Sequence, residues 1–536
     1  METRKKLPTS VQTFEEIRKR DYVYVDKTEY LVRLIDRGKN YFLARPRRFG
    51  KTIFTTTIKS LFEGKKELFK GLYAEEFLNR EDFEPSPVIH LDISEVTTSL
   101  GIEGIQESLI AITKQEAKKL EIELSDTKLY GNLLGELISK AKDKYKSNVV
   151  ILIDEYDKPY TDFVNNPDMA DKVRNVLRDY YIRIKSNDEQ IRFSFITGIS
   201  KFTKFGVFSV LNTPVDISMM TEYAEICGYT EAEIRKYFPD YLEETATKMQ
   251  VSTEELIAKM RDYYDGFSFD FDVSSRLYSP YSTLCFFENK KFVNFWMITA
   301  KPKIIADYMK DKHLTVEQFR NYPSSLDFVY SPGDMDTTPP EGYFLQSGFL
   351  TLKENVNSFC LLDYPNIEVL NSMSALLTEN ILKEDTNNFR SELFNALKFK
   401  DIKSLQNIFN RFLASIPYDD FAKAANQNVS IDGFRLPAQE WLYRSCLFSF
   451  LQGCYVVVSA EVHNNHGRAD LVIKYQDFVW IIELKVAYKP EDIQKKLDEA
   501  KTQFIEKQYT KPYPNSVCIA MVIDDEKRQI EKCEQI

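Results

Sequence analysis

Four short apolar runs divide the first 200 residues of this chain, at positions 41–44, 88–91, 149–153 and 193–196. Each run is followed by polar or glycine-containing sequence, and helical patterns lie between the runs. Continuous apolar runs of this length are typical of parallel strands that are buried on both faces and joined by crossover helices. The pattern therefore predicts an open α/β sheet with functional residues at the carboxyl ends of its strands.

The chain is too long for one hydrophobic core. Its 536 residues exceed the roughly 250–300 that a single core usually holds, so we expect several domains. We place an α/β domain at 1–225, a helical lid and connector at 226–430, and a small α/β domain at 431–536. The helical part begins with Thr230 as an expected N-cap, with Glu233 three residues on.

The last hundred residues change pattern again. Residues 290–430 show helical patterns broken by loops and no functional signature. After them we predict a helix at 437–452, strands near 455–462, 469–474 and 478–485, a helix at 490–507 and a strand at 517–523. The order of elements in this domain is therefore αβββαβ.

The charge balance restricts any contact with nucleic acid. Lys and Arg number 71 against 81 Asp and Glu, and the net charge of −10 argues against a chain coated in basic residues. DNA contact confined to a local basic groove is compatible with this balance and should be strongly salt-sensitive. Seven cysteines without a CxxC pair, no apolar signal region, and apolar runs far below the about 20 residues of a membrane span favour a cytoplasmic protein without a membrane partner.

The first apolar run leads into a phosphate-loop motif, YFLARPRRFGKT at 41–52. The pattern G-x-x-x-x-G-K-[ST] is met at Gly50, Lys51 and Thr52, but Arg45 replaces its first glycine. Gly50 lets backbone N–H groups approach phosphates, Lys51 supplies a charge for the β- and γ-oxygens, and Thr52 supplies a hydroxyl for Mg²⁺. The strand before and the helix after the motif favour a nucleotide site over a plain surface loop.

Three arginines lie inside this loop: Arg45, Arg47 and Arg48. We include Arg45 and Arg48 among the candidate nucleotide-binding residues. Contact with a neighbouring subunit or with DNA is an alternative, and so are ion pairs with acidic helices nearby.

An acidic pair follows the third apolar run, in VVILIDEYD at 149–157. We expect Asp154 to hold Mg²⁺ and Glu155 to polarise the attacking water as a general base. A single strand, at 88–91, separates this motif from the phosphate loop, which fits the additional-strand class of P-loop ATPases. The strand at 193–196 then ends in Thr197, where such ATPases place a polar residue near the γ-phosphate.

A second group of charges lies in HGRADLVIKYQDFVWIIELK at 466–485. Glu483 and Lys485 are two residues apart on a strand, so they point to the same face, and a hairpin can bring Asp470 beside them. Such a group could bind Mg²⁺ through Asp470 and Glu483 and activate water for phosphodiester hydrolysis. Glu440, in the preceding helix, could add a carboxylate, and Gln503, in the following helix, could brace the site.

An ordinary cross-strand ion pair is the alternative explanation for Glu483 and Lys485. The pair, however, follows the apolar VWII run at the end of a strand that reads as buried. Charges in such a place are costly unless they pair or bind metal. This position favours a functional site.

Together these motifs resemble a bacterial family that joins an N-terminal AAA-ATPase-like domain to a C-terminal PD-(D/E)XK nuclease-superfamily domain with a restriction-endonuclease-like fold. YVDKTEY, RPRRFGKT, ILIDEYDKP and FITGISKF carry the resemblance in the first domain, and GRADLVI and WIIELK carry it in the second. Arg45 in place of glycine is a feature of that family. The resemblance implies nuclease motifs at six positions: Glu440, Asp470, Glu483, Lys485, Gln503 and Tyr509.

The sequence leads us to expect an ATP-binding and ATP-hydrolysing protein coupled to a Mg²⁺-dependent nuclease that acts on DNA. A nucleotide-switched sensor, whose nuclease-like domain only binds nucleic acid, is the alternative. The intact phosphate-loop and acidic motifs argue against a purely structural adaptor. Because AAA-type ATPases usually assemble, a homo-oligomer is also expected, although no residue specifies a ring.

Overall fold

The computed structural model describes residues 4–163, 166–199, 214–296, 316–326, 340–356, 359–382, 386–416, 430–431, 434–435, 438–463, 468–475, 478–511, 513 and 515–536. The chain forms two compact units. Unit 1 comprises Met1–Ala300 and Asn321–Glu368, and unit 2 comprises Lys301–Arg320 and Val369–Ile536. The region that we placed at 226–430 is therefore divided between the two units.

A five-stranded parallel sheet forms the centre of unit 1, in the order β2-β3-β4-β1-β5. Its strands are β1 (Asn40–Ala44), β2 (Val88–Asp92), β3 (Val149–Asp154), β4 (Ile191–Gly198) and β5 (Val215–Asp216). All four apolar runs are strands, as predicted, while the two-residue β5 was not foreseen. The insertion of β4 between β1 and β3 confirms the additional-strand arrangement.

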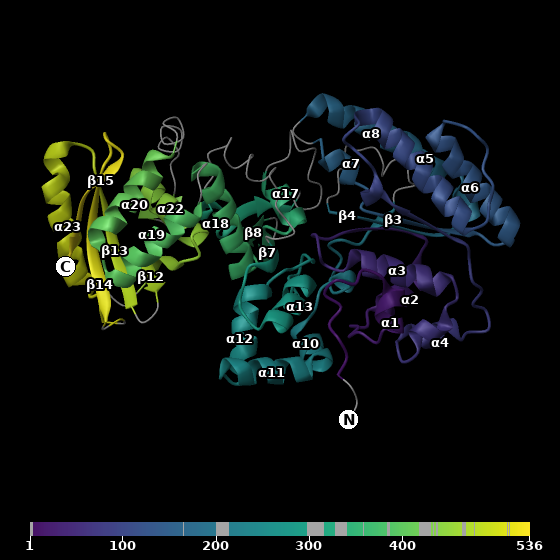
Figure 1. Ribbon diagram of the computed structural model, residues 1–536, viewed down its shortest axis with the longest axis horizontal. Helices are drawn as coiled ribbons and strands as arrows, with labels where there is room; N and C mark the ends of the chain where they lie inside the picture. The colour runs from purple at the N-terminus through teal and green to yellow at the C-terminus, as the bar shows by residue number, and fades with distance from the viewer. Residues whose placement is uncertain are drawn as a thin grey trace. The chain divides into compact units, whose positions relative to one another are not determined.

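Helices cover both faces of this sheet, as Figure 1 shows. One face carries α5 (Gly101–Lys119), α6 (Tyr130–Tyr145) and α8 (Pro167–Ser186), and the other carries α1 (Phe14–Lys19), α2 (Thr28–Arg37), α3 (Lys51–Phe62) and α4 (Ala74–Leu78). Every residue of β3 is buried. A strand covered on both faces needs apolar side chains on both, which explains its uninterrupted VVILI sequence.

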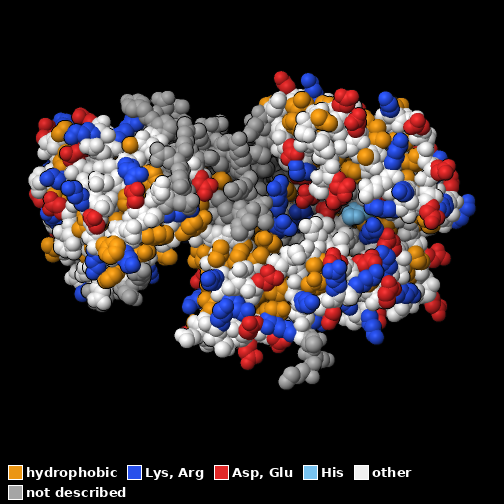
Figure 2. All heavy atoms as spheres, viewed as in Figure 1, with side chains coloured by type: hydrophobic (Ala, Val, Ile, Leu, Met, Phe, Trp, Pro, Cys, Tyr) orange, Lys and Arg blue, Asp and Glu red, His pale blue; other side chains and the backbone are white. Residues whose placement is uncertain are grey.

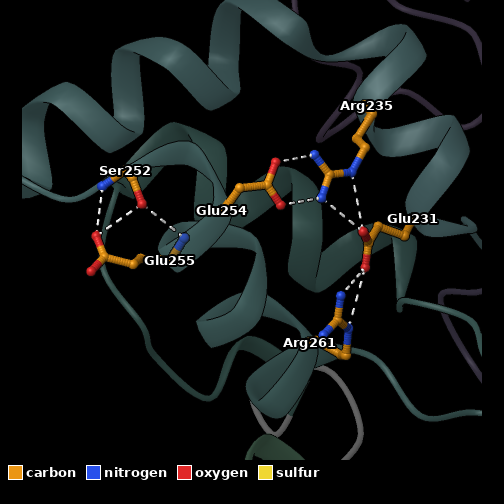
Figure 3. A network of polar contacts seen from close by, with 6 residues as sticks. All are labelled: Glu231, Arg235, Ser252, Glu254, Glu255 and Arg261. Atoms are coloured by element: carbon orange, nitrogen blue, oxygen red, sulfur yellow. Dashed lines mark hydrogen bonds and ion pairs between the residues drawn. The ribbon is translucent and has the colours of Figure 1, made fainter.

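A helical part follows in unit 1, built from α10 (Glu231–Tyr237), α11 (Pro239–Met249), α12 (Thr253–Tyr264) and α13 (Pro280–Asn289). The expected N-cap is confirmed, because Thr230 and Glu233 form a complete capping box at the start of α10. A second capping box, between Ser252 and Glu255, begins α12 (Figure 3).

The connector is not purely helical, contrary to our expectation. Three short antiparallel strands lie in it, in the order β6-β8-β7: β6 (Tyr322–Ser325), β7 (Thr351–Val356) and β8 (Phe359–Asp363). Strands of four to six residues offer too few positions for a period of two to stand out against neighbouring helices. The Pro/Gly-rich segment 331–343 lies mostly outside the described residues.

Unit 2 is built around a five-stranded mixed sheet in the order β11-β12-β13-β14-β15. Its elements are α18 (Ile367–Leu382, beginning at the boundary with unit 1), α19 (Thr386–Phe399), α20 (Ile402–Ala414), α22 (Ala438–Gly453), β11 (Val457–His463), β12 (Arg468–Tyr475), β13 (Phe478–Ala487), α23 (Ile493–Lys507), β14 (Ser516–Asp524) and β15 (Gln529–Gln535). The predicted αβββαβ order is confirmed, and the edge strand β15 is an addition to it.

Helices cover both faces of the sheet in unit 2. Strands β13 and β14 are parallel, and α23 makes the crossover between them. Helix α23 lies on one face of the sheet, and α22 lies on the other with α19 and α20 (Figure 1). Among the described helices of the whole chain, none is both long enough and apolar enough to cross a bilayer.

Candidate functional site

The phosphate loop connects β1 to α3 and is held by an aromatic anchor. Gly50 has a φ of +96°, a left-handed conformation that side chains rarely adopt, so a glycine is required there. Phe49, beside it, is buried, and its ring centroid lies 4.8 Å from that of Phe267 and 5.2 Å from that of Phe269. The anchor fixes the loop ahead of α3, where orphan backbone N–H groups favour anions.

Lys51 is buried inside this loop, with 5% of its surface exposed. Its Nζ donates to the carbonyl oxygens of Arg45 at 2.9 Å and Pro46 at 3.0 Å. Burial lowers the pKa of Lys51, and the carboxylates of Glu155 and Asp154 oppose this shift. Thr52 follows on the first turn of α3 and is half-buried. A cation and a hydroxyl are thus placed at the end of β1, near the acidic end of β3.

Asp154 and Thr197 are brought together at the carboxyl ends of neighbouring strands. The Thr197 hydroxyl donates to Oδ1 of Asp154, which also accepts the backbone N–H of Glu155 at 3.1 Å. Asp154 is 2% exposed and Thr197 is fully buried. Glu155 has a φ of +51°, which is unfavourable for a residue with a Cβ and is typical of strained positions at functional sites.

Asp157 is a further residue of this site that we did not predict. It is 1% exposed, and its Oδ2 accepts the backbone N–H of Ile199 at 3.1 Å. A Cβ on Gly198 would lie 2.6 Å from the ring of Tyr156 and 2.8 Å from Oδ1 of Asp157, so only glycine fits there. The second aspartate of the DEYD sequence was the available signal, but nothing in the pattern separated it from a solvated carboxylate.

The structure corrects our expectation for Arg45. Its guanidinium donates to four carbonyl oxygens, those of Ala44 (2.9 Å), Ser218 (2.6 Å), Tyr223 (3.1 Å) and Ala224 (3.3 Å). Arg45 is 1% exposed, and burial lowers its pKa to about 10. Arg45 therefore fastens the loop to the segment after β5 and is not presented to a nucleotide.

Arg48 is placed differently from Arg45. It is exposed, has a left-handed φ of +64°, and its guanidinium carbon lies 5.1 Å from the ring centroid of Tyr281 on α13. An exposed arginine at this point of the loop can reach an anion without breaking a buried network.

In unit 2, the end of β13 brings Glu483 and Lys485 together beside Asp470 of β12. Nζ of Lys485 lies 2.9 Å from Oε1 of Glu483, and Oδ2 of Asp470 accepts the backbone N–H of Leu484 at 2.8 Å. Glu440, on α22, joins them with its Oε1 3.5 Å from Nζ of Lys485. The predicted convergence of these side chains is therefore present.

The electrostatics of this cluster follow from burial and from an excess of carboxylates. Burial, reinforced by the charge of Asp470, raises the pKa of Glu483 to about 8. Burial also raises the pKa of Glu440. Although burial opposes it, the carboxylates of Glu483 and Glu440 raise the pKa of Lys485. The attraction of Lys485 favours the charged form of Glu483, but burial and the charge of Asp470 outweigh it.

Gln503 is linked to the strand that carries Asp470 through Tyr509. Its Nε2 donates to the hydroxyl oxygen of Tyr509 at 3.2 Å, and that hydroxyl donates to the carbonyl of Arg468 at 2.7 Å. Arg468 is the first residue of β12, two residues before Asp470. Gln503 thus braces the strand that carries Asp470, as we expected.

Both sites offer hard oxygen ligands suited to Mg²⁺. In unit 2, Oε2 of Glu483 is buried and accepts no hydrogen bond from the residues that the structure describes, and a cation beside Asp470 would satisfy such an oxygen. In unit 1, Thr52 and Asp154 supply a hydroxyl and a carboxylate. Within the described part of the chain, no group of three or more His, Cys, Asp or Glu side chains is close enough to hold a metal by itself. A metal would therefore need ligands from substrate or water as well.

The face seen in Figure 2 carries charges of both signs. On the face seen in Figure 2, Lys and Arg side chains are interspersed with Asp and Glu side chains over both units. A strongly basic stripe, which non-specific DNA binding would favour, is not visible on that face.

The fold and the two sites define a P-loop ATPase-like domain followed by a PD-(D/E)XK nuclease-like domain. Comparison with known proteins agrees: residues 8–208 match the family described as predicted AAA-ATPase, and residues 438–533 match the PD-(D/E)XK nuclease superfamily. The chain is also 32% identical over 494 residues to a protein of Azotobacter chroococcum mcd 1 described as an uncharacterized protein in the vnfD 5′ region, with 90% of each chain covered. The protein belongs to this family of AAA-ATPase-like proteins with a C-terminal PD-(D/E)XK nuclease-superfamily domain.

Proposed function

We propose that unit 1 binds and hydrolyses ATP with Mg²⁺ at the end of its parallel sheet. Lys51 would exchange its loop carbonyls for the β- and γ-phosphate oxygens, and Thr52 and Asp154 would hold the Mg²⁺ ion. Glu155 would orient and deprotonate the attacking water, and Thr197 would keep Asp154 oriented. Mg²⁺ supplies neutralisation of the charge that develops on the transferred phosphoryl group.

We further propose that unit 2 is a Mg²⁺-dependent nuclease that acts on DNA. Asp470 and Glu483 would hold the metal, and Lys485 would orient the attacking water or stabilise the charge on the phosphate. Lys489, Lys495 and Lys496 lie near this site in the sequence and would contact the DNA backbone. The bound metal would supply charge stabilisation of the phosphodiester and a lowered water pKa.

The observation that carries the nuclease proposal is the buried Glu483–Lys485 pair with Asp470 against the same strand. A surface ion pair would not need a carboxylate that is 1% exposed, because such pairs form in water at little cost. Burial of the Glu483 carboxylate beside two further carboxylates is costly unless a function or a bound cation offsets it.

The test is DNA cleavage by the full chain with Mg²⁺ and ATP. Asp470→Asn and Lys485→Ala should abolish cleavage, while Lys527→Ala, a change of the same type between β14 and β15, should leave it intact. If the first two variants cut DNA as well as the unaltered protein does, the nuclease proposal fails.

The sensor alternative is favoured by one specific contact. Nζ of Lys485 already contacts the carboxylates of Glu483 and Glu440, and Nη1 of Arg444 lies 3.9 Å from Asp470, so two cations partly offset the three carboxylates without a metal. A protein that hydrolyses ATP, loses hydrolysis in Lys51→Ala, and binds DNA without cutting it under any metal condition would support this alternative.

We propose a cytoplasmic location, and assembly into a homo-oligomer that an ATPase of this class commonly forms. Light scattering after size-exclusion chromatography, with and without ATP, would measure the second. A single monomer mass under both conditions would contradict it.

A further inference from the structure

A row of alternating charges continues from Asp470 into the interior of unit 2. Nη1 of Arg444 lies 3.9 Å from Oδ1 of Asp470, and Nη2 of Arg444 lies 3.7 Å from Oε1 of Glu317. Arg444 is on α22, four residues after Glu440, so both side chains lie on the same helix face. The side chains of Arg444, Glu317 and Asp470 are 2%, 11% and 13% exposed, so water screens these charges only weakly.

Glu317 comes from residues 290–430, whose sequence shows no functional signature. It begins the short 3-10 turn η6 (Glu317–Phe319), within the Lys301–Arg320 segment that belongs to unit 2. Val316 and Phe319, on either side of it, are buried, and the Ser445 hydroxyl donates to Oε2 of Glu317. The carboxylate is therefore held in a fixed place.

The spacing of the three charges determines what Arg444 can do to Asp470. The ion-pair distances of 3.7 and 3.9 Å both exceed that of a direct hydrogen bond, so the guanidinium lies between two carboxylates. An arginine that closed fully on Asp470 would occupy the oxygen and neutralise the charge that a divalent cation requires. Glu317 attracts the same guanidinium from the other side and opposes this closure.

We propose that Glu317 is a positioning residue of the nuclease site: it restrains Arg444 so that the carboxylate of Asp470 stays available to a divalent cation. The inference rests on the proposed function of unit 2, because it assigns a metal-binding role to Asp470. Ser445, which donates to Glu317, supports the same arrangement.

Mn²⁺ binding to the full chain tests this directly, measured by calorimetry without nucleotide and with the signal of Asp470→Asn subtracted. Glu317→Gln should weaken Mn²⁺ binding on the order of tenfold, the usual effect of losing a partner behind a metal ligand. Ser445→Ala should weaken it less, in the same direction. Glu491→Gln, the same change in the exposed turn η7 (Pro490–Asp492), should leave the affinity unaltered.

A double-mutant cycle separates positioning from general damage to the fold. If Glu317 acts through Arg444, Glu317→Gln has no further effect on Mn²⁺ affinity in the Arg444→Met background. An equal loss in both backgrounds, or no loss in Glu317→Gln alone, overturns the inference. If Arg444→Met does not fold, as judged by fluorescence of Trp441 and Trp480, the cycle is run with Ser445→Ala, where the double variant should match Glu317→Gln alone.

Failure of the positioning role of Glu317 and failure of the nuclease proposal give different results. A protein that binds Mn²⁺ through Asp470 but cuts no DNA fails the nuclease proposal and leaves the positioning role supported by the cycle. A protein whose Mn²⁺ binding is the same as that of Asp470→Asn overturns the positioning role itself.

Discussion

The ammonium nitrogen of Lys485 lies 2.9 Å from Oε1 of Glu483, and yet the pKa of Glu483 is raised to about 8. Burial is the main cause, and the charge of Asp470 adds to it. The ion pair is therefore part of an overcrowded acidic cluster, in which one proton can replace a missing cation. This relationship makes the stability of unit 2 depend on pH in a definite direction.

We expect the metal-free protein to lose stability as pH rises from 6 to 9. Because the pKa of Glu483 is raised, the folded state holds a proton that the unfolded state has already released. The stabilisation from this proton is complete below pH 4.5, the pKa of the unfolded state, and is lost as the pH rises through about 8. Over this pH range the free energy of unfolding should fall by roughly 2–3 kcal/mol.

Urea unfolding in EDTA, followed by tryptophan fluorescence in a Trp296→Phe background, measures this fall in unit 2. The variant Glu483→Gln cannot ionise and should flatten the dependence, while Glu491→Gln should retain it. An unchanged slope in Glu483→Gln would assign the dependence to another group.

The same substitution should destabilise the protein strongly at Arg45 and hardly at all at Arg48. Arg45→Met removes a buried donor from four carbonyl oxygens and should lower the free energy of unfolding by roughly 3 kcal/mol, with or without ATP. Arg48→Met is at an exposed position and should change it by less than about 0.5 kcal/mol. Thermal and urea unfolding check both values. A normal stability of Arg45→Met with lost ATP binding would restore our original expectation for Arg45.

Thr197→Val should reduce ATP turnover without reducing ATP binding to the same degree. Valine has a similar shape but cannot donate to Asp154, so the expected metal ligand loses its orientation and kcat should fall about tenfold. Steady-state hydrolysis gives kcat, and titration with a fluorescent ATP analogue gives the binding constant. Thr113→Val is the control, because Thr113 is equally buried but donates to Leu109 within α5. A similar loss of kcat in Thr113→Val would point to packing and not to the site.

Much of the fold could be predicted because burial on both faces of a sheet leaves a strong signal. The runs that became β1 to β4 are apolar at nearly every position, and the strand ends carry the polar residues that the site needs. The two-residue β5 and the strands β6, β7 and β8 were missed, since short strands have no readable period. Strand β15 was missed because its sequence, QIEKCEQ, is mostly polar and shows no clear alternation of apolar and polar residues. Ile530 is its one buried side chain.

The sequence predicted which residues lie together better than it predicted what each side chain contacts. The sequence placed Glu483, Lys485 and Asp470 together because strand geometry dictates which residues share a face. It could not show that Arg45 faces carbonyls of a segment more than 170 residues away, or that Glu317 lies near Arg444. Contacts of that kind depend on tertiary packing, which leaves no local pattern in one sequence.

The helical part of unit 1 contains a network of ion pairs and a helix cap, both drawn in Figure 3. Glu231 accepts from Arg235 at Nε (3.1 Å) and Nη2 (2.9 Å) and from Arg261 at Nη2 (2.6 Å), as Figure 3 shows. Nearby, the Ser252 hydroxyl accepts the backbone N–H of Glu255 at 3.2 Å. The contacts of Glu231 with the two arginines depend on charge. The Ser252 contact instead gives a backbone N–H at the start of α12 a hydrogen-bond acceptor.

Added salt should therefore reduce the stability loss of a Glu231 variant but not that of a Ser252 variant. Glu231→Gln should cost about 1 kcal/mol or less in low salt and close to nothing in 1 M NaCl, because partly exposed ion pairs are screened. Ser252→Ala should cost about 1 kcal/mol in both, since the loss of a cap hydrogen bond is insensitive to ionic strength. Urea unfolding is the suitable measurement, because guanidinium would itself screen the pairs. Equal losses for Glu231→Gln in low and high salt would mean that its carboxylate stabilises the fold through hydrogen-bond geometry and not through its charge.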